Sequence, residues 1–463
     1  MNRIVIIGGG PGGYEAALVA AQLHARVTVV DSDGIGGSAV LTDCVPSKTL
    51  IATAEVLTDM ASAEALGVTL ADAEGDAASW VTIDLARVNA RVKRLAADQS
   101  ADISARLERE GVRVVQGHGR LDGVGKVVVT LADGSKERLD ADAILVATGA
   151  APRVVPEAQP DGERILTWEQ VYDLDELPEH LIVVGSGVTG AEFASAYVAL
   201  GIDVTLVSSR ERVLPGEDAD AATVLEQVLT RRGMKLLSQS RMQSVTRDGD
   251  VVTVTLVDGR SVTGSHCVLA LGSIPNTAGL GLEEAGIRLD AQGFLKVDRV
   301  SRTSVTGVYA AGDCTGVLML ASVAAMQGRI AMWHYMGDAV SPIDLKKVSS
   351  NVFTSPEIAT VGWSQRAIDA GEIAAETVML PLATNARAKM QGISDGFVKL
   401  FCRPGTGSVV GGVVVAPRAS ELIHVVSLAV AESLTADQLA HAFTVYPSLS
   451  GSIAEAARRL HQV

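Results

Sequence analysis

Two glycine-rich segments have residue types and a spacing suited to holding the phosphates of a dinucleotide. They run from Gly8 to Gly13 (GGGPGG) and from Gly185 to Gly190 (GSGVTG). In a G-x-G-x-x-G segment, the first glycine permits a tight turn, the second lets the backbone approach a pyrophosphate, and the third lets helix and strand pack closely. The pyrophosphate then faces a helix N-terminus, whose unpaired N–H groups attract negative charge.

The two segments lie in matching units of sequence. Each follows a β-branched run and precedes an alanine-rich stretch typical of a helix. In each, the residue that ends the next apolar strand lies 23 positions after the first glycine; it is Asp31 in the first unit and Ser208 in the second. A single motif of this kind is weak evidence, but two that are framed by strand, helix and strand at equal spacing indicate two dinucleotide-binding units.

The residues at the two strand ends predict different ligands. Asp31 can accept hydrogen bonds from both ribose hydroxyls and would repel a 2′-phosphate, which suits FAD or NAD. Ser208 carries no charge, and either Arg210 or Arg212 could form charge-assisted hydrogen bonds with a 2′-phosphate. The alternative is that these arginines belong to a solvated loop face. We therefore expect the second unit to bind NADPH, and NADH as well.

The elements that would position these residues follow an α/β pattern. A long helix is expected over 83–110, and a third strand–glycine–acid region spans 307–313. Short strands are expected at 112–115, 127–131, 143–147, 251–257 and 268–271, and strands alternate with helices after about residue 342. The sequence therefore predicts an α/β protein with two Rossmann-like dinucleotide-binding domains and a C-terminal α+β region.

Composition excludes several classes of protein. The chain has 463 residues, whereas a single hydrophobic core stops growing at roughly 250–300 residues, so more than one domain is expected. A formal charge of −15 and 3% aromatic residues argue against a nucleic-acid partner. Four cysteines without a C-x-x-C pair predict neither a disulfide scaffold nor a metal site. The apolar stretches are too short for a transmembrane segment, so we expect a cytoplasmic protein.

One of the four cysteines lies at a predicted helix start. Cys44 precedes Pro46, which is typical of the first turn of a helix, and that helix is expected to continue to about Ala63. A thiol at a helix N-terminus has a lowered pKa, although an inert buried thiol is the alternative. The other three cysteines are expected to be core thiols; they are Cys267, Cys314 and Cys402.

Several further motifs extend over nearly the whole chain. They are the segments 36–48, 147–149, 307–313 and 352–359 (VFTSPEIA), in addition to the two glycine motifs. With these motifs the sequence resembles the pyridine nucleotide–disulfide oxidoreductase family, which includes lipoamide dehydrogenase and glutathione reductase. The resemblance implies FAD in the first unit, NAD(P)H in the second, and a C-terminal interface domain that forms a homodimer.

The resemblance also assigns site residues by position. The FAD pyrophosphate would be held by Gly8, Gly10, Gly12 and Gly13, and the adenosine ribose by Asp31. The remaining FAD positions are Gly37, Gly119, Thr148, Gly149, Asp313 and Ala321. The NAD(P)H site would be formed by Gly185, Gly187, Gly190, Ser208, Arg210 and Gly272. Lys48 matches a lysine near flavin N5 and Glu192 matches its ion-pair partner; a purely structural ion pair is the alternative.

Two positions depart from the disulfide reductases. The family's redox motif is two cysteines separated by four residues, but here the first position is Ala39 and only Cys44 remains. The family's C-terminal acid–base histidine is replaced by Tyr446, for which we expect a space-filling role rather than a hydrogen bond to the acceptor. Both features resemble a smaller branch of the family, the lipoamide dehydrogenase-like NAD(P)H:quinone reductases of bacteria.

The sequence therefore predicts an FAD-dependent NAD(P)H dehydrogenase (quinone). Hydride would pass from NAD(P)H to FAD, with Lys48 and Glu192 as catalytic residues, and two electrons would pass directly to a quinone-type acceptor without a dithiol relay. The alternatives are a soluble pyridine nucleotide transhydrogenase and a non-catalytic FAD-binding interaction protein. The expected domains are an FAD domain over 1–150 and 275–340, an NAD(P) domain over 151–274, and an interface domain over 341–463.

Overall fold

The chain forms two compact units in the computed structural model, which describes residues 1–68 and 81–460. The first unit consists of Met1–Ser47, Asn89–Arg153 and Gly272–Asp344, and the second of Lys48–Val88, Val154–Leu271 and Leu345–Val463. Helices α3 (Cys44–Ser62) and α4 (Leu85–Arg109) continue from one unit into the other. Residues 69–80 of the predicted domain 1–150 and residues 461–463 of the predicted domain 341–463 lie outside the described residues.

A parallel sheet forms the centre of the first unit. Its order is β18–β7–β1–β2–β3, with the bounds Val308–Ala310, Ala143–Val146, Arg3–Ile7, Arg26–Asp31 and Arg113–Gln116. Strand β1 is central, with β2 on one side and β7 on the other. Open α/β sheets bind ligands beyond the carboxyl ends of such central strands.

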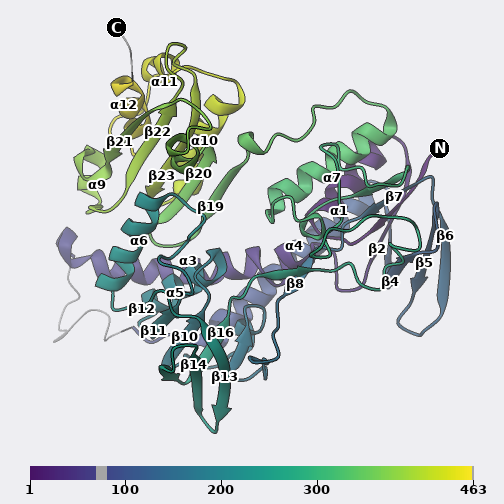
Figure 1. Ribbon diagram of the computed structural model, residues 1–463, viewed down its shortest axis with the longest axis horizontal. Helices are drawn as coiled ribbons and strands as arrows, with labels where there is room; N and C mark the ends of the chain where they lie inside the picture. The colour runs from purple at the N-terminus through teal and green to yellow at the C-terminus, as the bar shows by residue number, and fades with distance from the viewer. Residues whose placement is uncertain (69–80, 461–463) are drawn as a thin grey trace. The chain divides into compact units, whose positions relative to one another are not determined.

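Helices α1 (Pro11–Gln22) and α7 (Ala321–Met336) lie side by side in this unit (Figure 1). A Cβ added at Gly328 would lie 2.1 Å from the Gly12 carbonyl oxygen, so the two backbones touch only because α7 has a glycine there. This close approach fixes α7, which begins at Ala321, against α1, which follows the first glycine motif.

The first unit also contains a three-stranded antiparallel sheet, a pair of short strands, a short helix and a 3₁₀ turn. An antiparallel sheet has the order β4–β5–β6 and strand β8 pairs with β17. Their bounds are His118–Leu121, Lys126–Thr130, Lys136–Asp140, Ala150–Pro152 and Ser273–Pro275. Helix α2 (Gly37–Leu41) precedes α3, and a 3₁₀ turn (Asp313–Thr315) follows β18.

The second unit repeats the same sheet design. Strands β12–β11–β10–β16–β9 are parallel, with bounds Lys235–Leu237, Asp203–Val207, His180–Val184, His266–Leu269 and Ile165–Thr167. Strand β10 is central and leads into α5 (Val188–Ala199), just as β1 leads into α1. Helix α6 (Ala219–Arg231) follows β11, and an antiparallel sheet contains β13, β14 and β15 (Met242–Asp248, Val251–Leu256, Ser261–Gly264).

An antiparallel sheet near the C-terminus also belongs to the second unit. Its order is β19–β20–β23–β22–β21, with bounds Ser349–Val352, Glu357–Gly362, Val409–Ala416, Phe397–Cys402 and Glu376–Pro381. Helix α10 (Ala419–Ala431) packs on β20 and β23 (Figure 1). The other helices of this region are α8 (Gln365–Asp369), α9 (Ala386–Met390), α11 (Ala436–His441) and α12 (Gly451–Arg459).

A buried ion cluster connects this sheet with α6. Lys399 lies in β22 with only 2% of its side chain exposed, and its Nζ donates to both carboxylate oxygens of Asp218 (2.8 and 2.9 Å) and to Asp220 (2.6 Å). Asp218 is also the N-cap of α6, where it accepts the backbone N–H groups of Asp220 and Ala221. The cluster therefore fixes the start of α6 to the C-terminal sheet.

The predicted α/β class and the paired strand–helix–strand units are confirmed. The expected helix over 83–110 is α4, and the helix expected around Pro46 is α3, which begins at Cys44 with Pro46 in its first turn and ends at Ser62. The three-domain boundaries stay a prediction. No helix within the described residues combines the length and apolar composition needed to cross a bilayer.

Candidate functional site

The first glycine motif forms a tight turn between β1 and α1. Gly8 has a φ of +106°, and a Cβ there would lie 2.2 Å from the Ala147 carbonyl oxygen. A Cβ at Gly13 would lie 1.9 Å from the Gly8 carbonyl oxygen. These two glycines are therefore required by packing within the protein, whether or not a ligand is bound.

Gly10 is different because its free side faces open space. The nearest atom to a Cβ at Gly10 is the Cα of Gly37, at 3.8 Å. Gly10 is the N-cap of α1 and no side chain caps this helix. The first N–H groups of a helix lack partners inside it and attract anions. The turn therefore fits the pyrophosphate of FAD.

Asp31 ties the end of β2 to this turn. Its Oδ2 accepts the N–H of Gly9 at 2.6 Å, and its Oδ1 accepts the N–H groups of Asp33 and Gly34 at 2.8 and 2.6 Å. The structure therefore places Asp31 beside the glycine motif, where a ribose would lie. It also shows a second role that the sequence did not predict, because the carboxylate holds the backbone on both sides of the turn.

The other predicted FAD residues lie in the same unit. A Cβ at Gly119 would meet Val30 at 3.1 Å, so this glycine lies against the end of β2. Thr148 and Asn276 are locked together, because Thr148 Oγ1 donates to the Asn276 carbonyl at 2.6 Å and Asn276 Nδ2 donates back to the Thr148 carbonyl at 3.0 Å. Gly149 follows Thr148 with a φ of +68°, and Asp313 follows β18 at the same edge of the sheet.

Asp313 has a perturbed carboxyl group. Burial, with a smaller contribution from the negative charge of Asp43, raises the pKa of Asp313 to about 6. A carboxyl whose pKa is higher in the folded than in the unfolded state stabilises the protein below the unfolded pKa. That stabilisation is lost as the pH rises through the folded pKa.

We expect Asp313→Asn to stabilise the FAD-free protein at pH 7.5. The gain in free energy of unfolding should be at most about 3 kcal/mol, the value for about two pKa units, and should vanish near pH 4 where the wild-type carboxyl is protonated. Denaturant unfolding across this pH range measures the difference, with the exposed Asp122→Asn as control. A gain that does not change with pH would contradict the assignment.

The second glycine motif reproduces the geometry of the first. A Cβ at Gly185 would lie 2.1 Å from the Ala270 carbonyl oxygen, and one at Gly190 would lie 1.9 Å from the Gly185 carbonyl oxygen. Gly187, the middle glycine, meets nothing within 4 Å and is the uncapped N-cap of α5. This open space before an uncapped helix fits the pyrophosphate of a nicotinamide dinucleotide.

Ser208 is buried and its hydroxyl is engaged within the protein. Its Oγ lies 2.7 Å from Ser186 Oγ and accepts the backbone N–H of Arg210 at 3.1 Å. Ser186 occupies the position that Gly9 has in the first motif, so a hydroxyl pair here takes the place of the Gly9–Asp31 contact. The Arg210 side chain is exposed. Gly272 belongs to the first unit, where its carbonyl accepts the N–H of Arg153 at 2.9 Å.

Lys48 and Glu192 form the predicted ion pair. Lys48 Nζ lies 2.8 Å from Glu192 Oε2, and the side chain of Glu192 is 6% exposed. The second oxygen, Oε1, accepts the backbone N–H of Phe353 at 2.9 Å, and the Phe353 ring centroid lies 4.8 Å from Lys48 Nζ. The sequence did not identify this role of Phe353; its one signal was the position of Phe353 in the segment 352–359.

Three of the four cysteines are core residues, as predicted. Cys267 and Cys402 lie within β16 and β22, and Cys314 donates to the Ala311 carbonyl. Burial raises the pKa of all three thiols, to about 11 for Cys314 and about 12 for Cys402. Cys44, at the start of α3, is partly accessible. Tyr446 is 85% exposed on the chain considered alone.

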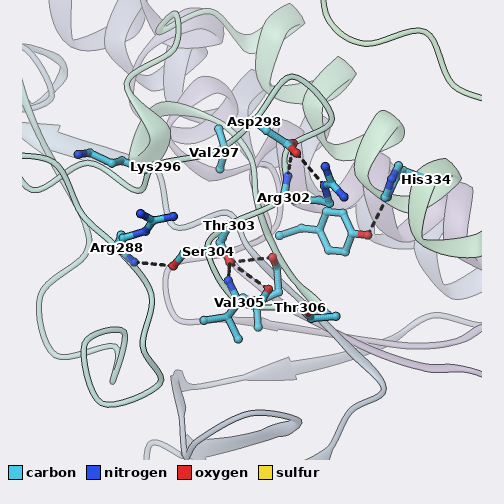
Figure 2. A pocket seen from close by; sticks show the side chains of 13 residues that line it. Arg288, Lys296, Val297, Asp298, Arg302, Thr303, Ser304, Val305, Thr306 and His334 are labelled. Carbon is cyan, nitrogen blue, oxygen red and sulfur yellow. Dashed lines mark hydrogen bonds and ion pairs between the residues drawn. The ribbon is translucent and has the colours of Figure 1, made fainter.

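A separate cavity of about 540 Å³ lies where β18 begins (Figure 2). Its lining includes the basic residues Arg288, Lys296, Arg302 and His334. It contains none of the residues predicted to bind FAD or NAD(P)H, and it lies at the amino end of β18, whereas Asp313 lies beyond the carboxyl end. This cavity is therefore distinct from the two dinucleotide sites.

Comparison with protein families matches both parts of the chain. The family described as pyridine nucleotide-disulphide oxidoreductase matches residues 2–328, and the dimerisation domain of that family matches residues 348–457. The first match covers the glycine motifs of both units, and the second covers the C-terminal antiparallel sheet.

Similar individual proteins are also known. The chain is 59% identical to the NAD(P)H dehydrogenase (quinone) of Mycobacterium tuberculosis, over 99% of this chain and 94% of that protein. It is 32% identical to the dihydrolipoyl dehydrogenase of Zymomonas mobilis, over 98% and 96%. The crystal structure of LpdA from M. tuberculosis has a TM-score of 0.95 and 58% identity, with both chains fully covered.

Proposed function

The chain belongs to the pyridine nucleotide-disulphide oxidoreductase family of FAD-dependent oxidoreductases, which use NAD(P)H, and we propose that it is an NAD(P)H dehydrogenase that reduces quinones. Bound FAD would supply the hydride-accepting and electron-donating chemistry. The observation that carries the proposal is that Ala39 occupies the position of one redox cysteine, in a chain that keeps both glycine motifs. The name of the M. tuberculosis relative supports the same acceptor.

The positions of the thiols support electron transfer without a dithiol relay. Thiol–disulfide exchange needs one thiolate to attack and a second to resolve the mixed disulfide. Cys267, Cys314 and Cys402 are buried, and their raised pKa values disfavour the thiolate that attack requires. A planar acceptor that takes two electrons, such as a quinone, needs no thiol.

The same proposal assigns the site residues. The FAD site, in the first unit, would be formed by Gly8, Gly10, Gly12, Gly13, Asp31, Gly37, Gly119, Thr148, Gly149, Asp313 and Ala321. The NAD(P)H site would be formed by Gly185, Gly187, Gly190, Ser208, Arg210 and Gly272. Lys48 would place its positive charge near flavin N5 and favour negative charge there, while Glu192 would orient Lys48.

We also propose a homodimer formed through the interface domain, 341–463, beside an FAD domain (1–150, 275–340) and an NAD(P) domain (151–274). The match to a dimerisation domain supports it. Large apolar side chains are exposed there on the single chain, as expected for a surface that a second copy covers; they include Val425, Leu428, Phe443 and Val445. A cytoplasmic location stays a prediction.

An acceptor panel tests the function. Purified enzyme with FAD and NADPH should reduce menadione and benzoquinone rapidly and lipoamide slowly or not at all. Rapid reduction of lipoamide together with failure on both quinones would overturn the proposal. An FAD that NADPH does not bleach anaerobically would instead support the non-catalytic interaction protein.

A transhydrogenase is the second candidate, favoured by Ser208, because no carboxylate at that strand end excludes either nucleotide. NADPH mixed with an NAD⁺ analogue in the absence of quinone tests it. Analogue reduction at a rate matching quinone reduction would favour the transhydrogenase, and reduction that is far slower would leave the quinone reductase as the better description.

We expect Arg210→Ala to weaken NADPH selectively. The exposed guanidinium would pair with the 2′-phosphate, which NADH lacks, so KM for NADPH should rise about tenfold while KM for NADH stays within a factor of two. Steady-state kinetics with both nucleotides measures this difference, and Arg212→Ala is the matched control for the neighbouring arginine. Equal losses for the two nucleotides would contradict the assignment.

A further inference from the structure

Arg288 and Lys296 are two cations that lie side by side in the first unit. They are directly opposite each other, because the antiparallel bridge between Leu289 and Leu295 sets the register. The Lys296 N–H donates to the Arg288 carbonyl at 3.1 Å. Opposite side chains of an antiparallel pair lie on the same face, with Cβ atoms about 5 Å apart, and like charges there are destabilising.

The protein does not neutralise these two charges. Neither side chain has a hydrogen bond or an ion pair within the part of the chain that the structure describes. The acidic residue two positions after each cation is engaged elsewhere. Asp290 accepts two backbone N–H groups of its own turn, and Asp298 pairs with Arg302 at 2.7 Å. An anionic ligand between Arg288 and Lys296 would therefore relieve their repulsion.

The two cations line the cavity of about 540 Å³ described above. Figure 2 shows Arg288 and Lys296 on one side of it and Arg302 and His334 on the other. Its volume lies within the roughly 300–1,000 Å³ typical of small-molecule sites. All residues that line it belong to the segment Gly272–Asp344, so the cavity is complete within the first unit.

Hydrogen bonds hold the backbone around this cavity. Ser304 Oγ accepts the Arg288 N–H and donates to the Gly286 carbonyl, both at 3.0 Å. Thr303 Oγ1 donates to the Val308 carbonyl at 2.9 Å. Because these bonds form within the protein, a ligand needs to order only side chains, which lowers the cost of binding.

The side of the cavity around Arg302 is polar but carries no net charge. Arg302 Nε donates to Asp298, while its two terminal nitrogens have no partner among the described residues. His334 Nδ1 lies 2.9 Å from Tyr309 Oη, so Nε2 is the ring nitrogen left for a ligand. This side can therefore form hydrogen bonds with uncharged oxygen atoms such as hydroxyl groups.

We propose that the cavity binds a small sugar phosphate, with its phosphate between Arg288 and Lys296. A phosphate monoester has nearly two negative charges and three acceptor oxygens, which match two cations. Its hydroxyl groups would contact Arg302 and His334. A dicarboxylate would divide its charge between the two sides and leave one cation uncompensated. The chain's charge of −15 disfavours a phosphate surrounded by further negative charge, as on a membrane.

Titration with glucose 6-phosphate tests the proposal. The enzyme is loaded with FAD and saturated with NADP⁺, so that both dinucleotide sites are filled, and should bind one molecule per chain. Lys296→Met and Arg288→Met should each raise the calorimetric Kd about tenfold or more, since each removes a charge-assisted contact. Lys126→Met, an exposed lysine of β5 outside the cavity, is the control. No binding to the wild type, or an unchanged Kd in either cavity variant, would overturn the proposal.

Related ligands test the chemical class. Inorganic phosphate should bind several-fold more weakly than glucose 6-phosphate, and succinate and glucose at least about tenfold more weakly. Arg302→Gln should narrow the preference for glucose 6-phosphate over inorganic phosphate. Succinate that binds as tightly as glucose 6-phosphate would overturn the proposal, as would binding to phosphatidic acid vesicles without any binding of glucose 6-phosphate.

A charge reversal separates lost recognition from lost folding. In Lys296→Glu a carboxylate replaces the ammonium opposite Arg288, so repulsion becomes attraction. This variant should melt at the same or a higher temperature than the wild type without ligand, while its binding of glucose 6-phosphate is abolished. A lower melting temperature would overturn the proposal, because Lys296 would then already be compensated within the protein.

Discussion

Gly187→Val is expected to weaken NADP⁺ binding by about a hundredfold or more while leaving the protein folded. A Cβ at Gly187 meets no protein atom within 4 Å, and its φ of −72° is accessible to valine. The side chain would fill the space before α5 where a pyrophosphate must approach the backbone. Calorimetric titration measures the loss, and the free energy of unfolding should change by about 1 kcal/mol or less.

Gly190→Ala is the informative comparison for this prediction. Its Cβ would lie 1.9 Å from the Gly185 carbonyl oxygen, so the backbone of the turn must move. This variant should lose stability as well as nucleotide binding, whereas Gly187→Val should lose binding alone. Normal NADP⁺ affinity in Gly187→Val would refute the location of the pyrophosphate.

Lys48→Met is expected to slow reduction of the flavin by NADPH about a hundredfold. A fixed positive charge near a developing negative charge contributes on this scale. The substitution also leaves Glu192, whose side chain is 6% exposed, without its ammonium partner. Removing one member of such a pair should lower the free energy of unfolding by about 3 kcal/mol. Anaerobic stopped-flow absorbance and denaturant unfolding measure the two effects.

A double variant separates these two effects. Lys48→Met combined with Glu192→Gln removes the unpaired charge, so stability should recover while flavin reduction stays slow. Lys347→Met is the control, because this exposed lysine donates to the Ala431 carbonyl, its one side-chain hydrogen bond among residues 1–68 and 81–460, and should alter neither measurement. Recovery of the rate together with stability in the double variant would show that the pair is purely structural.

The sequence predicted the strand, turn and helix around each glycine motif well. Short-range spacing determines a strand, a tight turn and a helix, and both glycine motifs fold as β–turn–α units with their middle glycines facing open space. The difference between Asp31 and Ser208 was also visible in the sequence. The partners of these residues were not, because a hydroxyl pair such as Ser186–Ser208 depends on how two neighbouring strand ends approach each other.

Long-range contacts could not be derived from local patterns. Lys48 and Glu192 are 144 residues apart, and only the family resemblance suggested that they meet. Nothing in the residues around Asn351 distinguishes it from an exposed polar residue of an edge strand. Only the folded chain shows that both polar ends of its amide are buried without a hydrogen-bond partner among the residues that the structure describes.

The ion cluster around Lys399 determines how this protein can be shortened. A gene product ending at residue 344 would keep Asp218, whose side chain is 3% exposed, but would lose the ammonium that neutralises it. The start of α6 would then carry an uncompensated charge at its cap, close in sequence to the arginine that we assign to NADPH. The C-terminal quarter of the chain is thus no detachable accessory, because it supplies the ammonium group that the cap of α6 requires.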